Sequence, residues 1–149
     1  MAEILFYHLE RQPLEAALPG LLLRSLERGW RVVVKVGSDE RLEALNAHLW
    51  SFDDASFLPH GSAADGNAEK QPVFLTTGDD NPNAATVRFL VDAAEAGDLS
   101  GYDRTVFMFD AADSEAVARS RIAWKAAREG GHDATYWRQD ENGRWTKAS

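Results

Sequence analysis

Apolar residues run continuously through several short segments of the chain and recur at helical spacing through others. Runs rich in β-branched and aromatic residues predict buried strands at 3–9, 31–36, 72–77, 86–91 and 105–110. Strands of this kind, without polar alternation, are buried on both faces, which is typical of a parallel sheet covered by helices.

The first helical pattern lies between Leu14 and Leu26, where leucines recur at helical spacing. Pro13 suits the first position of a helix, and Gly29 stands where a C-terminal cap belongs. Pro19 has no N–H to donate, and its ring crowds the preceding turn. Two alternatives stay open: a helix that is kinked at Pro19, or a main helix that begins there after a short first turn.

Two more helices follow further along the chain. Ser38 is a good N-terminal cap, and the acidic residues after it favour the positive end of the helix dipole. The buried face of this second helix carries Leu42, Leu45 and Leu49. A third helix is predicted over 114–129, before the glycine pair at 130–131.

The C-terminal segment predicts a hairpin. A short strand at 135–137 is followed by a turn centred on Asn142 and Gly143, and 144–146 returns beside it. The segment 138–149 thus forms a C-terminal hairpin and tail. The alternation of strands and helices predicts an α/β fold: a mainly parallel sheet flanked by helices, with an antiparallel C-terminal edge hairpin.

Length and composition indicate a globular protein. The 149 residues suffice for one domain, 1–149, in which the polar segment 61–71 is a loop without periodicity. There is no cysteine, which excludes disulfides and thiolate metal sites. The formal net charge of −8 argues against a surface that binds nucleic acid everywhere, yet it permits a local basic patch. The first strand begins near Met1 and no apolar run could span a membrane, so we expect a cytoplasmic chain without membrane contact.

A stretch of large aromatic residues follows the second helix. Trp50, Phe52 and Phe57 lie within eight positions, on a segment too short for a long helix and too irregular for a strand. Such side chains dominate core and interface energetics, so the stretch either fills the core or presents an apolar patch to a partner. His60 after this stretch is expected to be a hydrogen-bonded structural residue, and the adjacent carboxylates 53–54 are expected to solvate or cap a turn.

The sequence gives little support to catalysis. Ligands bind open parallel sheets at the carboxyl ends of the strands, and phosphate needs glycines there. Residues 10–13 contain no glycine, and Gly37 is followed by acidic residues that would repel phosphate. No serine lies in a nucleophile elbow. The histidines have no metal-ligand spacing: His8, His48, His60 and His132. We therefore expect no enzyme, no cofactor and no metal site.

The third helix separates two kinds of residue at 100° per position. Small residues share one side and permit a close approach to the sheet: Ala116, Ser120, Ala123 and Ala127. The neighbouring side carries Val117, Arg121, Trp124 and Arg128, with Lys125 at its margin. One interpretation is a charged surface helix whose tryptophan packs on Tyr136 or Trp137. The other is a site for an acidic peptide with an apolar anchor, and stacked nucleic-acid bases would use the same residue types.

Several short motifs, in order along the chain, resemble one known family. They are Phe6-Tyr7-His8-Leu9, Gly29-x-Arg31-Val32, Leu49-Trp50, Phe57-Leu58-Pro59-His60-Gly61, Gln71-Pro72-Val73, Arg121-x-x-Trp124-Lys125, Gly130-Gly131-His132 and Thr135-Tyr136-Trp137. Over essentially its full length the chain resembles the chi-subunit family of the bacterial DNA polymerase III holoenzyme. The block from the tryptophan to Phe-Leu-Pro-His is the most specific of these motifs.

The resemblance implies a Rossmann-like fold without a nucleotide site and a protein that is not an enzyme. Family members link the clamp loader, through the psi subunit, to single-stranded DNA-binding protein, and so contact DNA only indirectly. Psi packs on the surface that maps to Trp50, Phe57, Leu58 and Pro59. The acidic, Phe-ended tail of single-stranded DNA-binding protein docks on the surface that maps to Arg121, Trp124, Lys125 and Arg128. Relatives can have a basic residue at the position of Val117, so the basic rim is thinner here.

The resemblance also sharpens the interpretation of the aromatic stretch. We expect Phe52 in the core, and the psi-binding residues Trp50, Phe57, Leu58 and Pro59 on the surface. Two other functions remain as alternatives: an enzyme of the nucleotide-using α/β class with a degenerate phosphate loop, and a protein that binds single-stranded nucleic acid directly through Trp124 and the neighbouring arginines.

Overall fold

The computed structural model describes residues 2–10, 12–51, 58–92, 94–96, 99 and 101–148. The strands are β1 (Glu3–Leu9), β2 (Val32–Lys35), β3 (His60–Ser62), β4 (Val73–Thr76), β5 (Val87–Leu90), β6 (Arg104–Asp110), β7 (Asp133–Gln139) and β8 (Trp145–Lys147). The α-helices are α1 (Leu14–Glu27), α2 (Asp39–Ser51) and α3 (Ser114–Glu129), and short 3₁₀ turns lie at Ala63–Asp65 and Ala68–Lys70.

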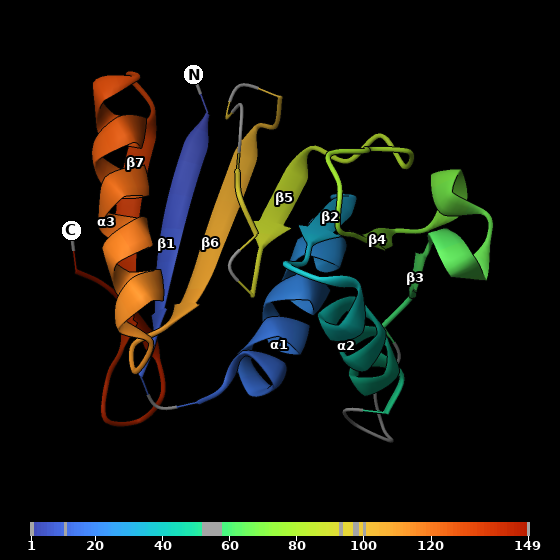
Figure 1. The fold of residues 1–149 in the computed structure, drawn as a ribbon, viewed down its shortest axis with the longest axis horizontal. Coiled ribbons are helices and arrows are strands. Elements are labelled where there is room, and N and C mark those ends of the chain that lie inside the picture. Colours follow the sequence, from blue (N-terminus) through green and yellow to red (C-terminus); the bar gives the residue numbers. More distant parts are fainter. Residues whose placement is uncertain are drawn as a thin grey trace.

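The described strands form one eight-stranded sheet in the order β3-β4-β2-β5-β6-β1-β7-β8 (Figure 1). Neighbouring strands are parallel, except that β8 returns antiparallel to β7 at one edge. The predicted α/β fold with an antiparallel C-terminal edge hairpin is therefore confirmed.

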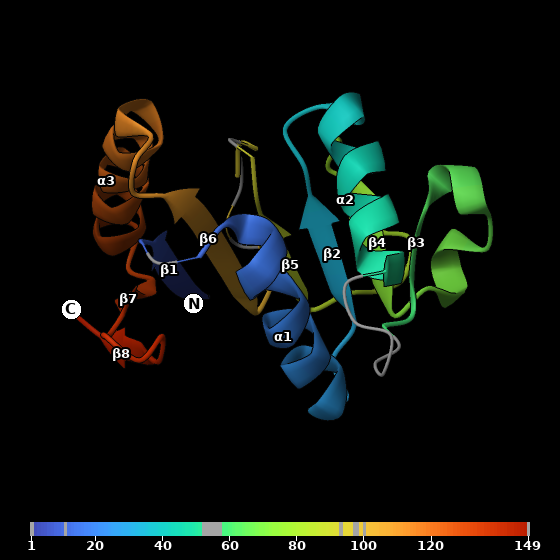
Figure 2. The same cartoon turned by 90° about the horizontal axis from the view of Figure 1, so that it is seen from below.

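Helices lie on both faces of the sheet (Figure 2). Leu5 and Leu9 of β1 belong to an apolar cluster with the leucines of α1 and α2. The alternate residues Ile4 and Phe6 belong to a second cluster with Ala127 of α3. Because successive side chains of a strand point to opposite faces, α3 covers the face opposite to α1 and α2.

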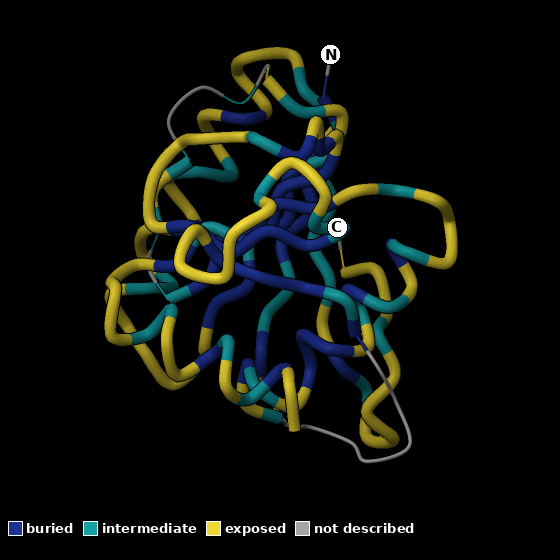
Figure 3. The backbone as a smooth tube through the Cα atoms, turned by 90° about the vertical axis from the view of Figure 1, so that its right-hand side faces the viewer, coloured by how far each residue is buried: buried dark blue, intermediate teal, exposed yellow. Residues whose placement is uncertain are grey.

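The helices cover different strands. α1 contacts β2 and β6, α2 contacts β3 and β4, and α3 contacts β1, β6 and β7. On the face that α1 occupies, β1 and β7 therefore extend beyond the helix towards the β8 edge. Buried residues concentrate in the strands, and exposed residues lie in the connections and on the outer sides of the helices (Figure 3).

Most predicted elements are confirmed within about two residues at their ends. Ser38 begins α2 as predicted, because its Oγ accepts a hydrogen bond from the backbone N–H of Arg41 at 3.3 Å. α1 continues through Pro19, so the alternative in which a helix begins there is wrong. The segment 61–71 is more ordered than a polar loop, since it completes the edge strand β3 and includes both 3₁₀ turns. In the part of the chain that the structure describes, no helix is long and apolar enough to span a membrane.

Candidate functional site

The residues predicted on one side of α3 lie together on the structure. α3 begins at its cap Asp113, whose carboxylate accepts bonds from the backbone N–H groups of Glu115 and Ala116. Arg121 and Arg128 are exposed on the side of α3 towards β7. The Lys125 side chain is 78% exposed and lies 4.0 Å from the carboxylate of Glu129, one turn further along.

Trp124 forms the apolar part of this helix face and is half-buried. Its ring meets Phe6 of β1 at 5.5 Å and Tyr136 of β7 at 6.1 Å, in both cases edge to face. The Arg128 guanidinium carbon lies 5.5 Å from the centre of the same ring. The tryptophan therefore packs on Tyr136, as one interpretation of the sequence expected, while Trp137 lies on the opposite face of the sheet. One side of its ring remains beside the arginines.

Tyr136, one of the two partners expected for the tryptophan, and His8, which the sequence assigned to no site, complete this surface. The Tyr136 hydroxyl lies 2.6 Å from Nδ1 of His8, and the His8 ring stacks on Phe109 at 5.1 Å. Burial lowers the pKa of His8; Glu10 and Asp110 act against this shift, whereas Arg138 and Arg121 act in the same direction. Burial also raises the pKa of Tyr136, so its hydroxyl stays protonated and donates to Nδ1 when the neutral imidazole of His8 carries its proton on Nε2. The register of the parallel strands places His8 between Phe109 on β6 and Arg138 on β7.

The other predicted surface lies at the end of α2. Trp50 is 56% exposed, and its ring centre is 4.5 Å from that of His60. His60 is buried, with Nδ1 2.7 Å from the Leu58 carbonyl oxygen and Nε2 3.2 Å from the Asn46 carbonyl oxygen. The expectation of a hydrogen-bonded structural histidine is confirmed: His60 joins the start of β3 to α2 and supports Trp50 from below.

One of the predicted surface residues is in the core. Leu58 is only 1% exposed and belongs to the same apolar cluster as Leu45 and Leu49 of α2, so the expectation of an exposed Leu58 is wrong. Burying this leucine is favourable, because its neighbours are the apolar face of α2. Pro59 is partly exposed. Phe57 and Phe52, with the carboxylates 53–54, lie outside the described residues.

A cleft of about 700 Å³ lies at the carboxyl ends of β1, β5 and β6. Its lining is rich in carboxylates: Glu15, Asp92, Glu95, Asp110 and Asp113. Arg41, one of its cations, is bound to Glu15 and, at 3.2 Å, to Asp92. The N–H groups at the start of α3 already bond Asp113. This chemistry disfavours phosphate, and the described residues contain no cluster of potential metal ligands.

Comparison with known proteins relates the chain to one protein family. The family model described as DNA polymerase III chi subunit, HolC, matches residues 1–135. A probable DNA polymerase III subunit chi from Rickettsia prowazekii (strain Madrid E) is 27% identical over 95 residues, 64% of this chain. The match covers 58% of that relative, so the chain spans less than two thirds of its length. The family model includes the α2 and α3 surfaces and most of the sheet, and the chain therefore belongs to the DNA polymerase III chi subunit family.

Proposed function

We propose that this chain is a non-catalytic connecting subunit, which binds the psi subunit of DNA polymerase III on one surface and the acidic tail of single-stranded DNA-binding protein on another. One observation carries the proposal. Trp50 lies where α2 ends beside the β3 edge, whereas Arg121 and Trp124 lie on α3 near the opposite edge (Figure 1). Two partners could therefore bind at the same time without contact between them.

The α2 surface has the properties of a protein-binding patch. The exposed indole of Trp50 rests on the buried His60, and Pro59, which precedes that histidine, is partly exposed. A tryptophan held in this way loses little conformational entropy when a partner covers it, which is a property of interface hot spots. Leu58 supports this surface from the core rather than by contact with psi.

The α3 surface fits an acidic peptide that ends in an aromatic residue. Among the described residues, no carboxylate forms an ion pair with Arg121 or Arg128. Their guanidinium groups remain available for charge-assisted, bidentate bonds to carboxylates. The exposed side of the Trp124 ring offers the adjacent apolar contact for the aromatic side chain.

Matched variants on the two surfaces test the proposal. Arg121→Ala should weaken binding of the tail peptide about tenfold or more, because a hydrogen bond to a charged group is lost, and should leave psi binding unchanged. Arg119→Ala is the control, because it removes the same charge from the other flank of α3, where Arg119 lines the carboxyl-edge cleft. Equal losses from the two variants would mean that only net charge matters and would contradict the proposal.

The converse experiment uses Trp50→Ala. Psi binding should fall at least about tenfold, as for an interface hot spot, while tail binding stays constant. Ile122→Ala is the matched control, since Ile122 is the other large apolar side chain that is clearly exposed in the described residues, at 71%, and it lies on α3. Loss of both binding activities in Trp50→Ala would indicate unfolding or a shared site, and would overturn the assignment of two surfaces.

A further inference from the structure

A second group of aromatic residues lies on the face opposite to α3. The ring planes of Tyr7 on β1 and Trp137 on β7 are 17° apart, with their centres at 6.1 Å. Trp145 on β8 meets Tyr7 edge to face at 4.7 Å. All three side chains are only partly buried, because α1 lies over β2 and β6 rather than over these strands. We refer to Tyr7, Trp137 and Trp145 as the aromatic platform.

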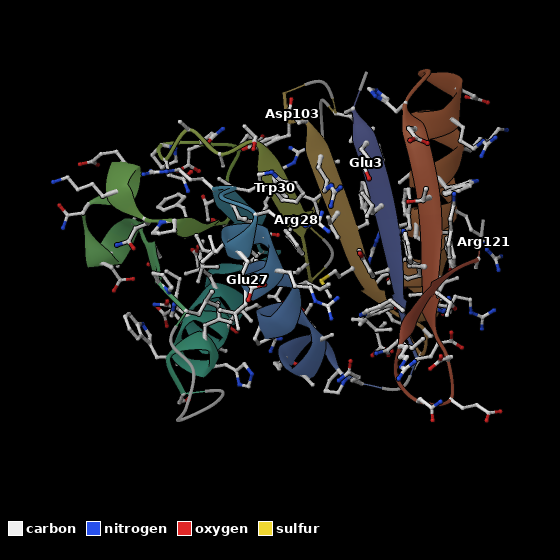
Figure 4. All side chains as sticks on the ribbon, turned by 180° about the vertical axis from the view of Figure 1, so that it is seen from behind. Glu3, Glu27, Arg28, Trp30, Asp103 and Arg121 are labelled. Atoms are coloured by element: carbon white, nitrogen blue, oxygen red, sulfur yellow. The ribbon has the colours of Figure 1, made fainter. Side chains whose placement is uncertain are left out.

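Arginines border the platform on the side of α1. Trp30, which follows α1, has the guanidinium carbon of Arg28 5.0 Å from its ring centre and that of Arg104 at 4.7 Å. These residues and Arg24 line a small cavity of about 90 Å³, to which Tyr7 also contributes. In Figure 4, which views the sheet from the side opposite α3, Arg28 and Trp30 lie where α1 ends beside β6, and Arg121 lies away from them near β7.

The guanidinium groups of this cavity are close to the platform. Burial raises the pKa of the Tyr7 hydroxyl, while Arg104, Arg24 and Arg28 each act to lower it. Arg104 bonds the carboxylate of Glu3 at 3.0 Å, so its charge is locally compensated. Within the described residues neither Arg24 nor Arg28 forms an ion pair. The two side chains remain available for an anion beside an aromatic surface.

The backbone of the platform limits which ligand it can take. β1 is paired with β6 and β7, and β7 is paired with β1 and β8, so the backbone polar groups of both strands are already used; among the described strands the only edge here is that of the short strand β8, Trp145–Lys147. The Trp137 indole N–H donates to the Thr135 hydroxyl at 2.9 Å. On the face of the sheet itself, the platform offers ring surface and the two cations Arg24 and Arg28. An extended peptide needs backbone partners or a strand edge, whereas nucleobases need only flat rings and phosphates need only guanidinium groups.

We propose that the aromatic platform with Arg24 and Arg28 is a binding surface for single-stranded nucleic acid, which goes beyond the two protein-binding surfaces proposed above. Unpaired bases stack on Tyr7, Trp137 and Trp145, as bases stack on aromatic side chains of a sheet face in RNA-recognition modules. A phosphate occupies the small cavity beside Trp30. Duplex nucleic acid does not fit this chemistry, because its bases are already stacked within the helix.

The negative net charge of the protein limits the affinity and the location of this binding. With a net charge of −8, most of the surface repels a polyanion, so binding is weak and confined to the arginine side of the platform. Two phosphate contacts give a logarithmic salt dependence with a slope of about −1.4 for a single strand. We therefore expect low affinity for single-stranded nucleic acid, with two ionic contacts to phosphates.

Titration of the whole protein with a labelled oligothymidylate of about ten nucleotides, followed by fluorescence anisotropy at low salt, tests the proposal. We expect saturable binding that weakens in Arg28→Ala and weakens further in the variant that also carries Arg24→Ala, with the salt slope reduced by about 0.7 per arginine removed. Trp145→Ala should lose about tenfold in affinity. Trp145→Phe keeps a stacking ring and should retain most of the binding, which separates lost stacking from a misfolded hairpin.

Arg121→Ala is the matched control, because it removes the same charge from the opposite face and should leave oligonucleotide binding unchanged. The proposal would be overturned by no saturable binding of the oligonucleotide at low salt, an equal loss in Arg121→Ala, equal affinity for an abasic strand of the same length, or equal affinity for a duplex. Displacement of the oligonucleotide by an acidic peptide at the same arginines would instead assign the platform to a peptide ligand, and would also overturn it.

Discussion

The imidazole Nε2 of His48 lies 2.7 Å from the backbone carbonyl oxygen of Glu15. That carbonyl is the one that Pro19 leaves without a helical partner, because proline has no N–H to donate to the residue four positions earlier. A side chain of α2 thus supplies the hydrogen bond that α1 lacks. This explains how α1 continues through an internal proline, and it joins the two helices at that point.

The pairing predicts a coupling between His48 and Pro19. His48→Ala leaves a partly buried carbonyl without a donor and should cost about 1–3 kcal/mol of unfolding free energy. In a Pro19→Ala background the backbone N–H of residue 19 can bond Glu15, so the same His48 substitution should cost less. Chemical unfolding of the four proteins in a double-mutant cycle measures the difference, and strictly additive effects would show that His48 does not compensate for the proline.

Arg41 makes a second connection between the same helices, and its contribution to the free energy of unfolding should decrease in acid. The hydrogen bond from Arg41 holds the pKa of Glu15 below its ordinary value of 4.5. The carboxylate therefore contributes stability above that value, and the contribution is lost as the pH falls through the lowered pKa in the folded state. Arg41→Met should cost about 1 kcal/mol at neutral pH, since both partners are partly exposed.

Unfolding of Arg41→Met and the parent protein at pH 7 and pH 3 checks this expectation. The difference between the two stabilities should shrink as the pH falls below 4.5, because protonation of Glu15 removes its ion pair with Arg41. A difference that is independent of pH would assign the effect of Arg41 to packing rather than to its ion pairs.

His8 should make the protein less stable in mild acid. Its pKa in the folded state lies below the ordinary value of 6.5, so the unfolded chain binds the proton more readily. Stability should therefore be complete above pH 6.5 and should fall as the pH drops below it, until the folded-state pKa is passed. His8→Gln, which can still accept from the Tyr136 hydroxyl, should remove this part of the pH dependence. Thermal unfolding of the two proteins between pH 7.5 and 5 measures it, and identical profiles would contradict the assignment.

Asn83 should be important for stability and irrelevant to binding. This buried side chain donates to the carbonyl oxygens of Val32 at 3.1 Å and Gln71 at 2.9 Å, so it fastens the turn before β5 to the starts of β2 and β4. Asn83→Ala removes both hydrogen bonds from the core and should cost about 1–3 kcal/mol. Peptide and oligonucleotide binding measured below the unfolding transition should not change, and a specific loss of binding would show an additional role.

Elements with a strong local pattern were predictable from the sequence. β1 is a nearly continuous apolar run, and α2 and α3 have apolar or small residues at helical spacing, so their types could be predicted. β3 was not predicted, because His60, Gly61 and Ser62 have no apolar pattern, although all three are buried beside β4. The continuity of α1 was not predictable for another reason: the residue that compensates for Pro19 lies on a different helix.

The candidate site shows the same contrast between features encoded locally and features that depend on distant residues. Arg121, Trp124 and Arg128 could be placed on one side of α3, because helix geometry relates positions three and four residues apart. Tyr136 was one of two expected partners of Trp124, but His8 could not be added, since its approach to Tyr136 depends on β7 lying beside β1 and on the face that α3 covers. The burial of Leu58 likewise depends on how α2 packs, which no short stretch of sequence encodes.

The position of β1 has a consequence for how the chain is made. Glu3 pairs with Arg104 on one side and with Asp133 on the other, so β1 leaves the ribosome well before either of its neighbours. Pairing between such distant segments is slow, because the long intervening chain must first be ordered. During synthesis β2, β4 and β5 can assemble while an apolar β1 remains unpaired. Nascent chains that end before β6 should therefore engage chaperones strongly, and that engagement should decline once β7 has emerged.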